Sequence, residues 1–89
     1  MEIILDCKKL TDKSSAHAYL KAQLSFPPYY GNNLDALYDC LMELSDCQII
    51  LQGVTLLYEM GEYGTALLEA FKDAARDNPN LELSVSTTI

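Results

Sequence analysis

Residues 2–7 read EIILDC, a short run in which β-branched and other apolar side chains follow one another with little interruption. A second run of the same kind, QIILQ, occupies residues 48–52. Short continuous apolar runs are typical of strands that are covered on both faces, as in parallel sheets. The two runs therefore predict a pair of buried parallel strands at the centre of the fold.

Helical patterns lie between these two runs and after the second one. We expect four helices: from near Ser14 to a point before Pro27 and Pro28, from Asn33 to about Leu44, from Thr55 to Met60, and from Tyr63 to Asp77. These limits come from apolar side chains at helical spacing, from the capping preference of asparagine, and from glycine and proline beyond the ends.

Near the end of the chain, Leu81, Leu83 and Val85 alternate with polar residues, which predicts a third strand with one face more exposed. The connections between strands are long enough for parallel crossovers. The chain is therefore expected to be an α/β protein with a small three-stranded parallel sheet packed with about four helices. A length of 89 residues fits a single domain, residues 1–89, with one core.

The overall charge points to the kind of partner. The chain has 13 acidic and 6 basic side chains and a net charge of -7, so its field repels polyanions and attracts cationic surfaces. Direct binding to nucleic acid is not expected. The chain has no apolar run of about 20 residues, and its start lacks the basic and apolar regions of a signal peptide, so we expect a cytoplasmic protein without a membrane segment.

The helix expected after Asn33 separates apolar from acidic side chains. At about 100° per residue, Asp35 and Asp39 fall on one stripe, and a row of leucines falls on the other side. The leucines are Leu34, Leu37, Leu41 and Leu44. Asp35 lies in the first turn, where the helix dipole stabilises a carboxylate. Asp39 has no such explanation, and repulsion between the two acids costs a few tenths of a kcal/mol.

Two interpretations of this stripe remain open from the residues alone. It is either a solvated acidic face or a recognition surface held on a rigid helix. Tyr29, Tyr30 and Tyr38 lie beside it, and aromatic rings next to carboxylates are typical of the centre of a protein interface. The alternative for Tyr29 or Tyr30 is that the ring packs the loop onto the core.

The sequence offers little for catalysis. His17 is the only histidine and has no serine or cysteine motif beside it, which favours a structural role. The glycines form no phosphate-binding loop, no metal motif surrounds the acids, and Cys7, Cys40 and Cys47 have no spacing that suggests a disulfide framework or a zinc site. A hydrolase using the acid pair would need a cleft that raises one pKa. We therefore expect no enzyme activity, no cofactor and no metal, and reduced, partly buried thiols.

Residues 29–41, YYGNNLDALYDCL, resemble the barstar family of intracellular inhibitors of the secreted ribonuclease barnase. Phe71 and Asp73 in the last helix, and the order of strands and helices, also look like that family. The resemblance implies a barstar-like fold and an inhibitor that blocks a basic ribonuclease with an acidic helix and the loop before it, in the manner of toxin and antitoxin immunity. It also implies that the acids replace RNA phosphates. We expect the free chain to be a monomer.

The resemblance assigns roles by position. Asp39 is similar to the acid that enters the phosphate pocket of the enzyme, Asp35 to an acid that pairs with basic residues beside it, and Asp73 to a peripheral acid. Tyr29 is similar to the ring that stacks on the catalytic histidine of the enzyme. The complete set of expected contact residues is Tyr29, Gly31, Asn33, Leu34, Asp35, Tyr38, Asp39 and Asp73.

The chain also departs from the family pattern. Tyr38 and Leu44 stand where the family has tryptophan, Glu43 stands where it has glycine, and Asp73 is shorter than the usual glutamate. These differences change the contact surface and leave the identity of the partner open. The alternative is an acidic immunity or regulatory binding module directed at a partner that is not a ribonuclease.

Overall fold

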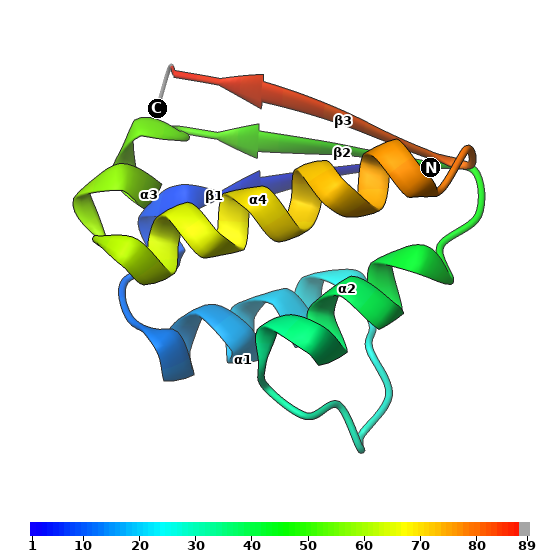
Figure 1. The fold of residues 1–89 in the computed structure, drawn as a ribbon, viewed down its shortest axis with the longest axis horizontal. Coiled ribbons are helices and arrows are strands. Elements are labelled where there is room, and N and C mark those ends of the chain that lie inside the picture. Colours follow the sequence, from blue (N-terminus) through cyan, green and yellow to red (C-terminus); the bar gives the residue numbers. More distant parts are fainter. Residues whose placement is uncertain (88–89) are drawn as a thin grey trace.

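The computed structural model describes residues 1–87. Along these residues the elements are β1 (Glu2–Asp6), the 3-10 turn η1 (Cys7–Lys9), α1 (Lys13–Leu24), α2 (Leu34–Met42), β2 (Cys47–Gln52), α3 (Thr55–Glu59), α4 (Glu62–Asp77) and β3 (Leu81–Ser86) (Figure 1). None of the helices in this range has the length and apolar character needed to cross a membrane.

The strands of residues 1–87 form one parallel sheet in the order β1-β2-β3. Ile3 lies opposite Ile49 and Leu5 opposite Leu51, and on the other side of β2 Ile49 lies opposite Leu83. Three parallel strands with four α-helices in the described range confirm the predicted α/β architecture. The order of elements in the chain is also the predicted one.

The helices lie on one side of the sheet (Figure 1). Helix α1 packs against β1, α4 packs against β3, and α2 packs on α4. Leu5, Ile49 and Leu51 point toward the helices and are fully buried. On the other face Ile4 is 51% exposed, and Glu82 is also exposed.

The prediction that β1 and β2 are covered on both faces is therefore wrong. A run of consecutive isoleucines and leucines reflects the preference of β-branched residues for strands as well as burial, and only every second side chain of such a run reaches the core. In β3, Leu81 is buried and Leu83 is partly buried, but Val85 is 52% exposed even though it lies in register with the buried Leu51. The apolar side chains of this edge strand are therefore less and less buried from the beginning of β3 to its end.

The two ends of α2 are fixed by asparagines. Asn33 is the N-cap, and its side-chain oxygen accepts a hydrogen bond from the backbone N–H of Ala36 at 2.8 Å. At the other end the buried Asn78, which follows α4, donates through its side-chain nitrogen to the backbone oxygens of Leu41 and Leu44, both at 3.0 Å. The same nitrogen lies 3.2 Å from the backbone oxygen of Met42, so the Asn78 side chain caps the carbonyl end of α2 and ties it to the end of α4.

The core lies between the sheet and the helices. Leu67, Phe71 and Ala74 of α4 are fully buried, as the helical pattern predicts. Gly64 allows α4 to cross α3 closely, because a Cβ at this position would lie 1.8 Å from the backbone oxygen of Leu57. Cys7 and Cys47 are buried and Cys40 is partly buried, as predicted, and all three are free thiols.

Candidate functional site

The α2 helix has the two-sided arrangement that its sequence predicts. Leu37 and Leu41 are fully buried, and Leu34 and Leu44 are partly buried against the core. Asp35 and Asp39 are exposed on the opposite side, and Tyr38 is half-buried between the two sets. The leucines hold the helix on the body of the protein, so the carboxylates project from a fixed backbone.

Neither acid is neutralised by the chain itself. Asp35 and Asp39 make no hydrogen bond and no ion pair with other residues of the range 1–87. Asp35 shares a surface hollow with Lys13 and Tyr63, and the Lys13 ammonium lies over the Tyr63 ring, 5.5 Å from its centroid. Both carboxylates are therefore available to a cation from outside the chain.

The loop before α2 is anchored by Tyr30, which is 5% exposed. The Tyr30 hydroxyl lies 2.7 Å from Nδ1 of His17, and the other ring nitrogen of His17 contacts the hydroxyl of Tyr63. The Tyr30 ring also packs against Phe26 with 4.8 Å between the ring centroids. Burial, with smaller effects of Cys40 and Tyr63, raises the pKa of Tyr30 well above its usual value, so the hydroxyl stays protonated.

The neighbouring Tyr29 has the opposite environment, because its side chain is 87% exposed. The two alternatives for the tyrosines are thus divided between them: Tyr30 packs the loop onto the core, and Tyr29 points outward. His17 is fully buried between two hydroxyl groups, which agrees with the predicted structural role. Its burial, and to a lesser extent the charge of Lys13, lowers its pKa.

A small hollow of about 180 Å³ opens between the loop and α2. Its walls are formed by Pro27, Tyr29, Tyr30, Gly31, Ala36, Asp39, Cys40 and Glu43. Burial raises the pKa of the Cys40 thiol, and the nearby Glu43 and Asp39 carboxylates add to this shift. The hollow therefore combines an apolar and aromatic wall with a strongly negative field.

A polar cluster connects α2 to the last turn of α4. The Tyr38 hydroxyl donates to Oδ2 of Asp77 at 2.6 Å. Arg76 binds the same carboxylate with two donors, Nε to Oδ1 at 3.0 Å and Nη2 to Oδ2 at 3.2 Å, and its Nη1 reaches Oδ1 of Asp73 at 3.2 Å. We call these four residues the Arg76 clamp: Tyr38, Asp73, Arg76 and Asp77.

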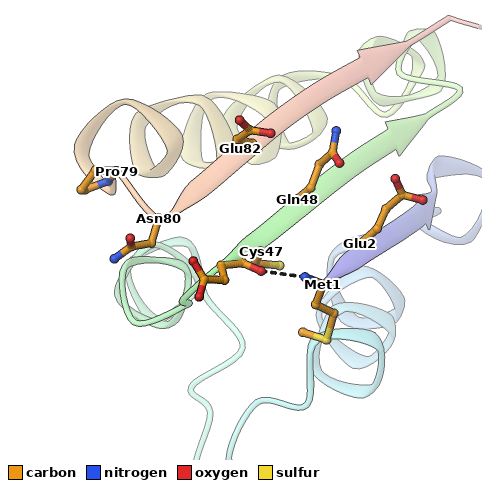
Figure 2. Close-up of a pocket in the computed structure, with 8 residues that line it drawn as sticks. Met1, Glu2, Cys47, Gln48, Pro79, Asn80 and Glu82 are labelled. Atoms are coloured by element: carbon orange, nitrogen blue, oxygen red, sulfur yellow. Dashed lines mark hydrogen bonds between the residues drawn. The ribbon is translucent and has the colours of Figure 1, made fainter.

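A separate hollow of about 400 Å³ lies at the amino edge of the sheet. Figure 2 shows Glu2, Gln48 and Glu82 side by side on the open face, and the amino group of Met1 donates to the backbone oxygen of Asp46 at 2.8 Å. Within residues 1–87 we find no group of three histidine, cysteine, aspartate or glutamate side chains placed to hold a metal ion. The lining of this hollow shares no residue with the hollow beside Asp39.

The family model described as barstar, the barnase inhibitor, matches residues 1–86 of the chain. The chain belongs to the barstar family. One relative is the "Putative ribonuclease inhibitor YrdF" of Bacillus subtilis (strain 168), which is 34% identical over 79 residues, or 85% of this chain and 87% of the relative. Both comparisons support a role like that of the barnase inhibitor, and members of the barstar family are inhibitors rather than enzymes.

The structure brings most of the residues expected from the barstar family into one region. Tyr29, Gly31, Asn33, Leu34, Asp35, Tyr38 and Asp39 lie on the loop before α2 and on its first turns. Asn33 and Gly31 shape this region, because the Asn33 side chain donates to the backbone oxygen of Gly31 at 3.2 Å. Asp73 lies on α4 and joins the region only through the Arg76 clamp.

The sequence reasoning missed two members of that clamp. The spacing of Asp73 and Arg76, three residues apart on one helix, is a signal for an ion pair. The contact between Tyr38 and Asp77 joins residues 39 positions apart, and nothing local in the sequence indicates it. The negative hollow that includes Cys40 and Glu43 was also missed, since it forms only when the loop folds back on α2.

Proposed function

We propose that this chain inhibits a basic, barnase-like ribonuclease by placing α2 and the loop before it in the active-site groove of the enzyme. Asp35 and Asp39 take the places of RNA phosphates, and the chain, acting as one domain in the cytoplasm, binds without catalysis. The observation that carries this proposal is the state of Asp39. It is exposed, free of any ion pair with residues 1–87, and held on a helix whose other side is in the core.

The surroundings of Asp39 support this assignment. The hollow beside it, at about 180 Å³, is smaller than the roughly 300 Å³ or more typical of pockets for drug-sized ligands, and it suits a single side chain of a partner. Tyr29, 87% exposed at the wall of the hollow, is free to stack on such a side chain. The family resemblance gives this stacking role to the ring at position 29, with the catalytic histidine of the enzyme as its partner.

The remaining contact residues are proposed to set the shape of the surface. Gly31, Asn33 and Leu34 place the loop and the start of α2 against the enzyme, and Tyr38 adds a half-buried ring between the acids and the core. Asp73 is a peripheral contact, and its pairing with Arg76 reduces the charge that it offers. Asp35 and Asp39 therefore supply most of the attraction.

The test compares Asp39→Asn with the wild-type chain in a purified assay of RNA cleavage by barnase and by other basic, barnase-like ribonucleases. The substitution keeps the shape of the side chain and removes its charge. We expect inhibition of the cognate enzyme to weaken by about 100-fold, or about 3 kcal/mol, because a cation of the enzyme would lose its partner in a water-excluded contact.

Glu59→Gln is the control, because Glu59 is exposed on α3 and makes no hydrogen bond or ion pair with residues 1–87. Asp12 would be a poor control, since it caps α1 by accepting from the backbone N–H of Ser15. Equal inhibition by the Asp39 and Glu59 variants would overturn the assignment. Binding of a target without any effect on RNA cleavage would favour a regulatory module instead.

The same mechanism predicts a kinetic signature. A chain of net charge -7 that meets a basic enzyme should associate more slowly as salt rises, because the Debye length falls from about 10 Å at 0.1 M to about 3 Å at 1 M. Dissociation should respond less to salt, since it depends on contacts from which water is excluded.

A further inference from the structure

The Arg76 clamp leaves α4 with a different electrostatic character from α2. Its charged members are two carboxylates and one guanidinium, and the guanidinium contacts both carboxylates. Asp77 accepts hydrogen bonds from Arg76 and from Tyr38, and these contacts, the Arg76 bonds first, lower its pKa. The acids of the clamp are therefore already paired, whereas Asp35 and Asp39 are not.

Arg76 also keeps donors that the clamp does not use. A guanidinium has five N–H groups in a fixed plane. Three of them are directed at Asp73 and Asp77, which leaves one N–H on each terminal nitrogen. Because 68% of the Arg76 side chain is exposed, these two donors are accessible to another protein.

The clamp lies beside the proposed contact surface. Tyr38 belongs to α2 between Asp35 and Asp39 in sequence, and its hydroxyl ends at Asp77 on α4. Arg76, in turn, binds the same carboxylate through two parallel hydrogen bonds, a geometry with defined direction. A protein that covers Tyr38 would therefore also meet the guanidinium edge of Arg76.

We propose that Arg76 is a specificity-determining residue of the inhibitory surface. It withdraws Asp73 and Asp77 from cation binding, and it presents its two free N–H donors to a carboxylate or carbonyl oxygen of the partner. The cognate ribonuclease accordingly has no lysine or arginine opposite the last turn of α4, although its active-site groove is basic. This inference rests on the proposed function and adds the chemistry of the partner at the edge of the same surface.

The withdrawal of the two acids is tested on the free chain with ethylguanidinium chloride as a cationic probe. The carboxyl carbon signals of the aspartates are followed by NMR during the titration. In the wild type we expect Asp35 and Asp39 to respond and Asp73 and Asp77 to stay unchanged. In Arg76→Gln all four should respond.

Lys9→Gln is the matched control, because it removes the same single charge from an exposed position. Lys9 ends η1, which follows β1 at the carboxyl edge of the sheet, whereas Arg76 precedes β3 at the amino edge. The Lys9 variant should therefore titrate like the wild type. A response of Asp73 and Asp77 in the wild type equal to that of Asp39 would overturn the proposal.

The effect on the partner is measured with the enzyme that the chain inhibits most strongly in the cleavage assay. Arg76→Gln should weaken inhibition of this enzyme about tenfold, the size expected for loss of one charge-assisted contact, while Lys9→Gln changes it less than about twofold. Arg76→Lys keeps the charge but loses the planar fork, so it should restore only part of the inhibition. Inhibition by Arg76→Gln equal to that by Lys9→Gln would refute the specificity role.

The two proposals fail in different ways. If Asp39→Asn inhibits as well as the wild type, the proposed function is wrong, whatever the Arg76 variants do. If Asp39→Asn loses inhibition while Arg76→Gln keeps it, the function stands and the role of Arg76 is wrong. If no barnase-like enzyme is inhibited, the partner chemistry assigned to Arg76 falls with the function, and the titration still decides whether the clamp withdraws its acids.

Discussion

Two adjacent tyrosines, one buried and one exposed, allow stability and recognition to be separated in the same loop. Tyr30→Phe removes a hydroxyl that lies 2.7 Å from Nδ1 of the fully buried His17 and leaves that nitrogen without this partner. An unpaired buried polar group costs about 1 to 3 kcal/mol, so we expect the free energy of unfolding to fall by about 2 kcal/mol. Tyr29→Phe should change it by less than about 0.5 kcal/mol, because Tyr29 is 87% exposed.

Urea unfolding followed by circular dichroism measures both effects, with the midpoint compared at a constant slope. Inhibition provides the second measurement, for which Tyr29→Ala is added. Tyr29→Ala should weaken binding of the ribonuclease with little loss of stability, whereas Tyr30→Phe should lose stability and, once folded, bind almost as well as the wild type. If the Tyr29 and Tyr30 phenylalanine variants unfold at the same urea concentration, His17 does not depend on the Tyr30 hydroxyl, and the account of how the loop is anchored is wrong.

Further predictions concern His17 and Asn78. The pKa of His17 is lowered in the folded chain, chiefly by burial. The contribution of neutral His17 to the free energy of unfolding is therefore fully present above pH about 6.5 and is lost as the pH falls through the depressed folded pKa. Urea unfolding from pH 8 to 4 should show this loss, and His17→Gln should lack that part of the pH dependence. Asn78→Ala should lower the free energy of unfolding by about 2 kcal/mol, because it removes the side-chain donor to the carbonyls of Met42 and Leu44 at the end of α2. Asn80→Ala, at an exposed neighbouring position, is the control in the same urea assay.

The sequence predicted the elements well because their signals are local. The N-cap at Asn33, the leucine spacing of α2 and the proline after Asn78 each act within a few residues, and the structure places the ends of the elements close to the predicted positions. The burial of the sheet was predicted wrongly, because the run at residues 2–7 contains the same residue types whether one face or two are covered. Which face the helices cover is decided by packing across the whole chain.

The candidate site also contains features that local sequence predicts and features that depend on packing between elements. Asp35 and Asp39 were found because helical spacing places them on one side, and the structure confirms that they are exposed. The Arg76 clamp depends on how α4 lies against α2, so no local pattern indicates that Tyr38 and Asp77 meet. Chemistry carried by one element can thus be read from spacing, whereas chemistry shared between elements requires the fold.

The free energy gained by burying the leucines of α2 explains how the chain tolerates two aspartates that repel each other on the opposite side of the helix. Repulsion between Asp35 and Asp39 costs a few tenths of a kcal/mol. Burial of Leu37 and Leu41, both fully inaccessible to solvent, contributes roughly 2 kcal/mol for each side chain. The free energy gained by burying the two leucines is therefore several times larger than the cost of the repulsion between the two aspartates.

Asp39 differs from Asp73 and Asp77 of α4 in how its charge is balanced. Asp73 and Asp77 are relieved of their repulsion by Arg76 inside the chain, and a cation from outside would have to compete with that guanidinium. Within residues 1–87 no cation pairs with Asp39, so a cationic partner would come from another molecule. If α2 binds a basic groove as proposed, the repulsion between Asp35 and Asp39, which the buried leucines sustain in the free chain, would be relieved.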